Sequence, residues 1–426
     1  MNRRKLLGLG GATAISAATA VQGRRSRPAP RWLPTWVSMP QLTEPNNLPP
    51  APFTGADAVL VDTTLRQTVH TSIGGGSVRL RFSNAFGGTA LPITAVSIAR
   101  PAGGRAGVAA TEPGTTRPVT FSGRPFVTIP PGAQAVSDPV DLAVPARSEL
   151  AVTVYLAAGQ AGLAITSHPG SRTTSHLLRG DHHDAADLPG ATPVDHWYLL
   201  SGVEVRTAEP TATIVLGDSL TDGRGSTTNG NDRWPDQLSA RLRGRRAILN
   251  QAAGGNRVLA DGLGPSALAR LDRDVLAVGG AATLIVFEGV NDIGTAAATE
   301  AAQQQVTADL IAAYRQIVTR THALGIRVYG ATITPFGGNT GYDDPAGLRE
   351  ASRQAVNTWI RTSGRFDAVV DFDKAARDPA NPRQLLPAYD DGDHLHFKPL
   401  GYQALADAVP AGLFRQRPLP PGFGFN

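Results

Sequence analysis

Near the carboxyl terminus, the stretch YDDGDHLHFKPLGY (389–402) gathers three aspartates and two histidines within seven residues. Two pairs in it have the spacing D-x-x-H: Asp391 with His394, and Asp393 with His396. An imidazole oriented by a carboxylate can act as a general base, so the stretch suggests acid–base chemistry. The two histidines of His-x-His could instead bind a metal. These residues alone leave open which pair matters and for which chemistry.

A metal site would need more ligands than one pair of histidines. Asp391 could join His394 and His396, and the segment GDHHDAAD contributes His182 and His183. That segment is rich in Gly and Asp and is more typical of a solvated loop, so we expect no metal. The chain has no cysteine, which excludes disulfides, thiolate nucleophiles and Cys-ligated zinc.

Three other segments place polar groups where strand-like runs end. VLGDSLTDG holds Ser219, whose hydroxyl needs a base from elsewhere in the fold, and it does not match G-x-S-x-G. FEGVNDIG holds Asn291, whose amide can donate to an oxyanion, although Asn-Asp is also common in caps and turns. LNQAAGGNRVLA holds Gly254 and Gly255, where a backbone N–H can closely approach a ligand. With a histidine and an aspartate, these groups are the parts of a Ser-His-Asp acyl-transfer site.

The elements that must position these groups follow from the rhythm of residues 207–426, where apolar strand-like runs alternate with helical ones. Strands are predicted at 211–217, 246–250, 283–289, 327–334 and 367–372, and helices at 233–242, 300–324, 346–362 and 402–413. This alternation predicts a mainly parallel sheet covered by helices on both faces. Ligands of such sheets bind beyond the carboxyl ends of the strands, where the candidate residues lie.

Residues 32–206 have a different pattern. Short runs of alternating apolar and polar residues, at 77–86, 92–99, 117–123, 126–130 and 149–157, are separated by turns rich in Gly and Pro. We find no convincing amphipathic helix among them. The pattern predicts a separate all-β domain, a β-sandwich that is jelly-roll-like.

The first twenty residues resemble an export signal. A basic start at 3–5 precedes an apolar, small-residue run that ends in Ala18-Thr19-Ala20, an A-x-A-like cleavage site. The pair Arg3-Arg4 resembles a twin-arginine signal, and an ordinary Sec signal is the alternative. We therefore predict a secreted bacterial protein, with residues 21–31 disordered after cleavage.

Length and charge bound the remaining possibilities. A chain of 426 residues suggests two domains. Removing residues 1–20 removes three of the 40 basic residues and no acidic one, which leaves 37 against 35. This near balance does not indicate nucleic acid as a partner. The mature chain has no stretch long and apolar enough to span a membrane, and the sequence does not indicate an oligomeric state.

In the order of these motifs, residues 211–415 resemble the SGNH (GDSL) hydrolase family. Its first block is matched by Gly217-Asp218-Ser219-Leu220, and the glycine of its second block by Gly255, with Gly254 the less favoured register. Its G-x-N-D block is matched by Gly289-Val290-Asn291-Asp292, and its D-x-x-H block by the 389–402 stretch. The resemblance implies a flavodoxin-like three-layer α/β/α fold and ester hydrolysis without a cofactor.

The resemblance also implies roles for individual residues. Ser219 would be the nucleophile, and the oxyanion hole would be the N–H groups of Ser219 and Gly255 with the side chain of Asn291. Family members commonly have five residues from the histidine to the glycine of G-Y, which favours His396 with Asp393. His394 would then lie exposed or packed beside the loop. The motif neighbours Asp218, Gly289 and Asp292 would support the site.

The two-domain layout is similar to that of secreted bacterial acylhydrolases, including some associated with xylan breakdown. We therefore expect a secreted serine esterase that acts on short-acyl esters, among them acetyl groups carried by carbohydrate. Its partner would be a small-molecule or polysaccharide ester. Two alternatives are a lipase or phospholipase for longer acyl chains, and a carbohydrate-binding surface protein whose hydrolase domain is vestigial.

Overall fold

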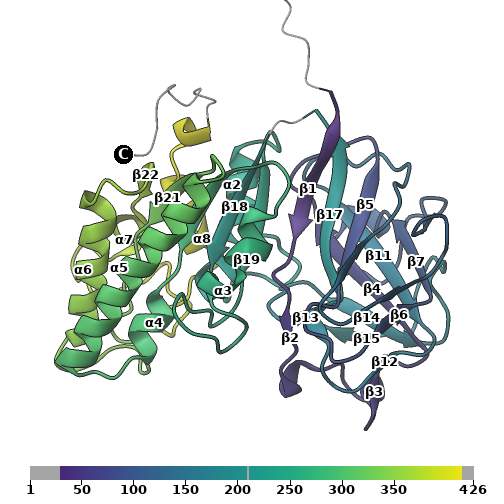
Figure 1. The fold of residues 1–426 in the computed structure, drawn as a ribbon, viewed down its shortest axis with the longest axis horizontal. Helices are drawn as coiled ribbons and strands as arrows, with labels where there is room; N and C mark the ends of the chain where they lie inside the picture. The colour runs from purple at the N-terminus through teal and green to yellow at the C-terminus, as the bar shows by residue number, and fades with distance from the viewer. Residues whose placement is uncertain (1–28, 209–210, 415–426) are drawn as a thin grey trace, which may run out of the picture.

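The computed structural model describes residues 29–208 and 211–414. The predicted export signal at 1–20 and most of the segment predicted to be disordered lie outside the described residues. An all-β domain and an α/β domain lie side by side (Figure 1). Across the described part of the chain, no helix has the length and apolar character needed to cross a membrane.

Two antiparallel sheets make up most of the N-terminal domain. Their strands are β1 (Arg31–Val37), β4 (Thr63–His70), β5 (Val78–Ser83), β7 (Ala95–Ala99), β8 (Arg117–Val119), β10 (Gln134–Val136), β11 (Glu149–Leu156), β14 (Ser175–Arg179), β15 (Thr192–Val194) and β17 (Leu200–Thr207). One sheet has the order β1-β17-β5-β10 and the other β15-β14-β4-β11-β7-β8. The chain crosses from one sheet to the other between β4 and β5 and again between β10 and β11, as in a sandwich of two sheets.

The core of the sandwich explains the alternating sequence pattern. Val78, Leu80 and Phe82 of β5 are buried, because every second side chain of a strand points to the same face. Shorter strands complete the domain: β2 (Gln41–Leu42), β3 (Ala58–Val59), β6 (Leu91–Ile93), β9 (Val127–Ile129), β12 (Gln160–Ala161), β13 (Thr166–His168) and β16 (Trp197–Tyr198). Its helical turns within 29–208 are 3-10 turns at Pro45–Asn47 and Ala102–Gly104.

The predicted disorder over 21–31 is wrong at its last residue. Arg31 begins β1 and pairs with Thr207, the last residue of β17. The backbone hydrogen bonds of this pair order Arg31, whereas the Arg- and Pro-rich sequence before it had suggested no ordered structure. The first and last strands of the domain are thus neighbours in one sheet.

The C-terminal domain is built on a five-stranded parallel sheet. Its strands are β18 (Ala212–Gly217), β19 (Ala247–Ala252), β20 (Ala281–Phe287), β21 (Arg327–Ala331) and β22 (Ala368–Val370). They are ordered β19-β18-β20-β21-β22, which is the flavodoxin-like order 2-1-3-4-5. The chain adds β19 on one side of β18 and then β20, β21 and β22 on the other side, so the strand order reverses at β18. Strand β18 leads directly to Ser219.

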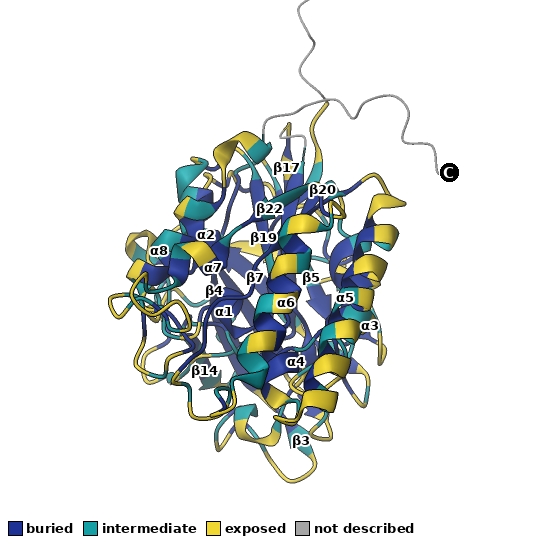
Figure 2. Cartoon of the chain, turned by 90° about the vertical axis from the view of Figure 1, so that its left-hand side faces the viewer, coloured by how far each residue is buried: buried dark blue, intermediate teal, exposed yellow. Residues whose placement is uncertain are grey.

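Helices cover both faces of this sheet. They are α1 (Ser219–Asp222), α2 (Trp234–Arg241), α3 (Ala267–Leu271), α4 (Val290–Thr295), α5 (Glu300–His322), α6 (Leu348–Thr362), α7 (Phe372–Ala376) and α8 (Pro399–Ala408). One group consists of α3, α4, α5 and α6, and the other of α2, α7 and α8. Figure 2 shows α5 and α6 with exposed residues on their outer faces. The predicted three-layer α/β/α fold is confirmed.

The two domains share an interface along one edge of each sheet. Strand β1 contacts β19, and the two strands lie beside each other in Figure 1. The buried apolar residues of both domains form one connected cluster. The N-terminal domain is therefore packed against the edge of the parallel sheet.

Candidate active site

Ser219, His396 and Asp393 form a chain of hydrogen bonds at the carboxyl edge of the parallel sheet. Ser219 Oγ lies 2.8 Å from His396 Nε2, and His396 Nδ1 lies 2.6 Å from Asp393 Oδ2. The other oxygen of Asp393 accepts the backbone N–H groups of Leu395 and His396, at 3.0 and 2.8 Å. These bonds fold the D-x-x-H segment into a turn that fixes the carboxylate against the imidazole.

The competing pair, Asp391 with His394, is not formed. His394 Nδ1 instead bonds Asp390 Oδ2 at 2.7 Å, and about half of the His394 side chain is exposed. The backbone N–H of Asp391 donates to the carbonyl of His396 at 2.9 Å. His394 thus lies exposed beside the loop, where the resemblance placed it.

The other histidines of the proposed metal cluster lie in a separate loop. His183 Nδ1 bonds Asp181 at 2.6 Å, and His182 Nε2 lies 3.0 Å from the carbonyl of Arg179. Over residues 29–208 and 211–414, no three His, Asp or Glu side chains are grouped so that they could hold a metal ion.

The surroundings of His396 favour its neutral imidazole. Burial lowers the pKa of His396, the Asp393 carboxylate raises it, and the guanidinium groups of Arg224 and Arg172 lower it again. The net shift is downward, so His396 stays unprotonated at neutral pH, as a general base must. Burial raises the pKa of Asp393, but its hydrogen bonds with His396 and Leu395 and the charge of His396 bring that pKa below its usual value.

A tight turn after β18 presents Ser219. Asp218 caps helix α1 by accepting the N–H of Leu220 at 2.9 Å. A Cβ at Gly217 would lie 2.4 Å from Thr221 Oγ1, so the close packing of α1 on the strand end requires glycine. Burial raises the pKa of Asp218 to about 7. Asp218 thus holds the turn through its cap on α1.

Asn291 has its amide fixed by two hydrogen bonds. Nδ2 donates to the carbonyl of Asn256 at 2.8 Å, and Oδ1 accepts the hydroxyl of Tyr342 at 2.6 Å. An amide nitrogen has two N–H donors, so one remains for a ligand. Gly255 has a φ of +68°, and a Cβ there would lie 2.6 Å from Leu263 Cδ1. The structure thus brings Ser219, Gly255 and Asn291 to one cavity.

The two remaining motif residues hold the loops around Asn291. Gly289 caps α4 with a φ of +117°, and a Cβ there would lie 2.6 Å from the Tyr314 hydroxyl. Asp292 accepts the backbone N–H groups of Val258 and Leu259, both at 2.9 Å. The carboxylate therefore ties the segment after Gly255 to the start of α4. Burial raises the pKa of Asp292.

A buried polar network lies beneath these loops and gave no sequence signal. Arg270 donates to Asn256 Oδ1 at 3.0 and 2.8 Å and pairs with Glu288 at 3.2 Å and Asp274 at 3.4 Å. Asn256 in turn presents its carbonyl to Asn291. The network therefore contacts the candidate oxyanion donor Asn291 through Asn256.

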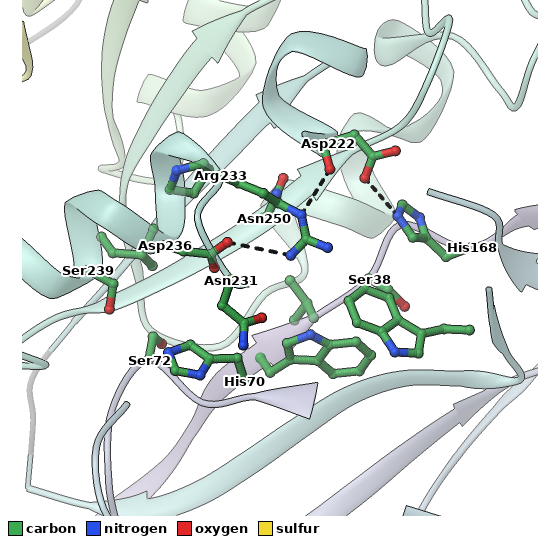
Figure 3. A pocket seen from close by; sticks show the side chains of 15 residues that line it. Ser38, His70, Ser72, His168, Asp222, Asn231, Arg233, Asp236, Ser239 and Asn250 are labelled. Carbon is green, nitrogen blue, oxygen red and sulfur yellow. Dashed lines mark hydrogen bonds and ion pairs between the residues drawn. The ribbon is translucent and has the colours of Figure 1, made fainter. Parts of the chain in front are cut away.

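The N-terminal domain reaches the nucleophile loop through a contact that sequence reasoning missed. His168 Nε2 bonds Asp222 Oδ1 at 2.8 Å, and Asp222 Oδ2 accepts the N–H of Gly254 at 3.1 Å. Arg233 Nε donates to the carbonyl of Asp222 at 3.0 Å (Figure 3). Asp222 stands in the motif stretch VLGDSLTDG, but its partner is a histidine 54 residues earlier. No local pattern predicts that pairing.

The cavity drawn in Figure 3 lies at this domain interface and is too small for a substrate. It measures about 30 Å³. The N-terminal domain lines it with His70 and His168, and the α/β domain lines it with Asn231, Arg233 and Asp236. A space of this size holds a water molecule or two. It is distinct in size from the open cavity at Ser219.

We expect His168→Ala to lower the free energy of unfolding by about 1–3 kcal/mol, because Asp222 loses its partner while it stays buried. Turnover should fall as well, because Asp222 holds Gly254 next to Gly255. Chemical denaturation and ester-hydrolysis kinetics measure the two effects. His183→Ala, which removes a more exposed histidine of the same domain, should change stability by less than about 0.5 kcal/mol. Equal stability of the two variants would contradict the role assigned to His168.

The cavity at Ser219 has a volume of about 530 Å³ and is lined by both domains. The catalytic domain contributes Tyr342 and Leu263 beside the candidate catalytic groups. The opposite wall comes from three segments of the N-terminal domain. Its residues are Gln41, Glu44, Asn47, Pro169, Gly170, Arg172 and His196.

The fold and the site together define a class: an α/β protein with the side chains of a serine hydrolase at the carboxyl edge of its sheet. Residues 215–404 match the model of the GDSL-like Lipase/Acylhydrolase family. Residues 215–404 therefore form a domain of this family, and the match supports a hydrolase or esterase. No curated protein matches the chain.

Several solved structures are similar to part of the chain. One is a putative lipolytic protein of the G-D-S-L family from Desulfitobacterium hafniense, with 18% identity, 46% of this chain and 97% of that chain covered, and a TM-score of 0.36. Another is a variant of Axe2, an acetyl xylan esterase from Geobacillus stearothermophilus, with 20% identity, coverages of 47% and 93%, and a TM-score of 0.36. A third is a GDSL-like lipase from Bacteroides thetaiotaomicron, with 15% identity, coverages of 48% and 87%, and a TM-score of 0.37.

Proposed function

We propose that this protein is a secreted serine esterase that hydrolyses short-acyl esters of polar alcohols, carbohydrates among them. The observation that carries the proposal is the hydrogen-bonded chain Ser219–His396–Asp393, which opens on a cavity shared with Gly255 and Asn291. A nucleophile, a base, an orienting carboxylate and oxyanion donors are the parts that acyl transfer requires. The signal-like residues 1–20 support export.

In the first half-reaction, Ser219 Oγ attacks the ester carbonyl while His396 Nε2 takes the hydroxyl proton. The oxyanion is held by the N–H groups of Ser219 and Gly255 and by the amide of Asn291. Gly254 is the less suitable glycine, because its N–H already donates to Asp222. His396 then gives its proton to the leaving alcohol, and an acyl-Ser219 remains.

In the second half-reaction, water attacks the acyl-enzyme. His396 removes a proton from the water, and the tetrahedral intermediate again places its oxyanion among the same donors. Collapse of the intermediate breaks the bond to Ser219 Oγ, which takes the proton back from His396. Asp393 keeps Nδ1 of the imidazole hydrogen-bonded throughout, so Nε2 faces the reaction.

The lining of the cavity favours a polar alcohol over a long acyl chain. The wall from the N-terminal domain presents amide, carboxylate, guanidinium and imidazole side chains, whereas a lipase needs an apolar groove for its acyl chain. The apolar contributions come mainly from Leu263, Leu395 and Tyr342. This supports a short acyl group beside a polar leaving group.

A covalent label tests the proposal. Diisopropyl fluorophosphate should modify one equivalent of Ser219 and abolish hydrolysis of p-nitrophenyl acetate in step, as measured by peptide mass spectrometry and turnover. Ser219→Ala should take up no label, and Ser226→Ala, which removes a nearby hydroxyl, should be labelled normally. Hydrolysis that persists in Ser219→Ala would overturn the proposal, and a protein that neither reacts nor turns over esters would be the vestigial alternative.

A further inference from the structure

Two arginines face the cavity at Ser219, one from each domain. Arg172 lies in the loop between β13 and β14 of the N-terminal domain, and Arg224 lies just after helix α1. The backbone of Arg224 is fixed, because its N–H donates to the Ser219 carbonyl at 3.1 Å and its carbonyl accepts the Tyr402 hydroxyl at 2.6 Å. These bonds hold the backbone from which the Arg224 side chain starts beside the nucleophile turn.

Neither guanidinium has a carboxylate partner in the part of the chain that the structure describes. Arg172 Nε is buried, and no acceptor among the described residues lies within hydrogen-bond distance of it. A guanidinium that lines a substrate cavity and has no carboxylate partner is suited to an anionic acceptor that arrives with the ligand. Arg224 is exposed at the rim of the same cavity.

The carboxylates of the cavity already have donors of their own. Glu44 accepts Gln41 Nε2 at 2.5 Å and Asn47 Nδ2 at 2.9 Å. Asp222 accepts His168 and the N–H of Gly254. The acidic groups in the wall are thus directed toward neighbouring donors, whereas the two arginines are left without acidic partners.

The two arginines line the same cavity as His396. Both lower the pKa of His396, after the larger effects of burial and of Asp393, so their charges act at the imidazole. His396 is the group that protonates the leaving alcohol in the proposed reaction. A negative charge on the alcohol would therefore be attracted to the arginines as the alcohol reaches His396.

We propose that Arg172 and Arg224 form a subsite for an anionic group, a carboxylate or a phosphate, on the alcohol part of the ester. A guanidinium presents paired N–H donors that match the oxygens of either anion. The substrate class is then the short-acyl esters of acidic alcohols, such as acidic sugars or phosphate-bearing polyols. This inference rests on the proposed esterase function.

Three acetyl esters test the subsite: acetylated glucose, acetylated glucuronic acid and acetyl glycerol phosphate. At low salt, kcat/KM should be at least about tenfold higher for a charged ester than for the neutral one, and the ratio should shrink in 1 M NaCl. A preference for the glucuronic ester would identify a carboxylate as the anion, and a preference for the glycerol phosphate ester a phosphate. Equal kcat/KM for all three would overturn the proposal.

Variants locate the effect. Arg172→Gln with Arg224→Gln should bring the charged-to-neutral ratio close to one, whereas Arg245→Gln, an exposed arginine at the amino end of β19, should keep it. The double variant should also shift the acid limb of the neutral-ester profile to higher pH, because removing two cations raises the pKa of His396. A retained ratio or an unmoved limb would overturn the proposal. If the wild-type protein hydrolysed none of the three esters, the esterase function itself would be refuted.

Discussion

His396→Ala is expected to lower kcat for p-nitrophenyl acetate by about 10⁴-fold or more, because Ser219 loses the base that takes its proton. The hydroxyl of serine is a weak nucleophile at its ordinary pKa, so without the imidazole the attack is slow. Binding and the oxyanion donors remain, and they should leave a small residual rate above that of water. Steady-state kinetics at neutral pH measure the loss.

His394 provides a matched control two residues away in the same loop. His394→Ala removes an imidazole that is half exposed and bonded to Asp390, so kcat should change by less than about threefold. Imidazole added to the buffer should restore part of the activity of His396→Ala and none of that of a misfolded protein. Comparable losses in the two variants would show that the D-x-x-H pairs have been assigned wrongly.

Asn291→Ala should lower kcat by about 10²–10³-fold with a smaller change in KM, because an oxyanion donor acts mainly in the transition state. The substitution also leaves the Asn256 carbonyl without its donor, which should cost about 1–3 kcal/mol of stability. Assays at low temperature, where the variant remains folded, separate the two effects. Kinetics and thermal unfolding of the same preparation give both numbers.

Tyr342→Phe is the control for this second prediction. It removes the hydroxyl that donates to Asn291 Oδ1 at 2.6 Å but keeps the amide N–H groups. Its kcat should fall by less than about tenfold, since only the orientation of the amide is weakened. If Asn291→Ala keeps kcat within threefold of the wild type, the amide is not an oxyanion donor.

The parallel sheet could be predicted well from the sequence because its strands are apolar runs between helical patterns. The predicted strand at 211–217 is observed at Ala212–Gly217, and the helix predicted at 300–324 ends at His322. The last helix was predicted at 402–413 but runs from Pro399 to Ala408, because Pro399 favours the first turn. The site could be predicted in outline because its residues follow strand ends in a fixed order.

Contacts between the domains could not be predicted. His168 meets Asp222, and Arg172 faces the cavity, only because the sandwich packs against the edge of the catalytic sheet. Nothing in the residues around His168 indicates a buried carboxylate partner. Such information is carried by tertiary structure and not by a local pattern. The pair Asp393 and His396 is different, because the interval from His396 to Gly401 favoured it and the bonds of Asp393 Oδ1 that build its turn are local.

The pairing of Arg31 with Thr207 has a consequence for how the chain folds. The first strand of the N-terminal domain finds its place only beside the last, so the sheet closes over a loop of nearly the whole domain, and contacts this distant in sequence make folding slow. During synthesis, β1 must wait until Thr207 has been made, immediately before the first strand of the catalytic domain. The wall that carries Arg172 and its neighbours can therefore be completed only after β17 has been made, and the nucleophile loop follows β17 by about a dozen residues.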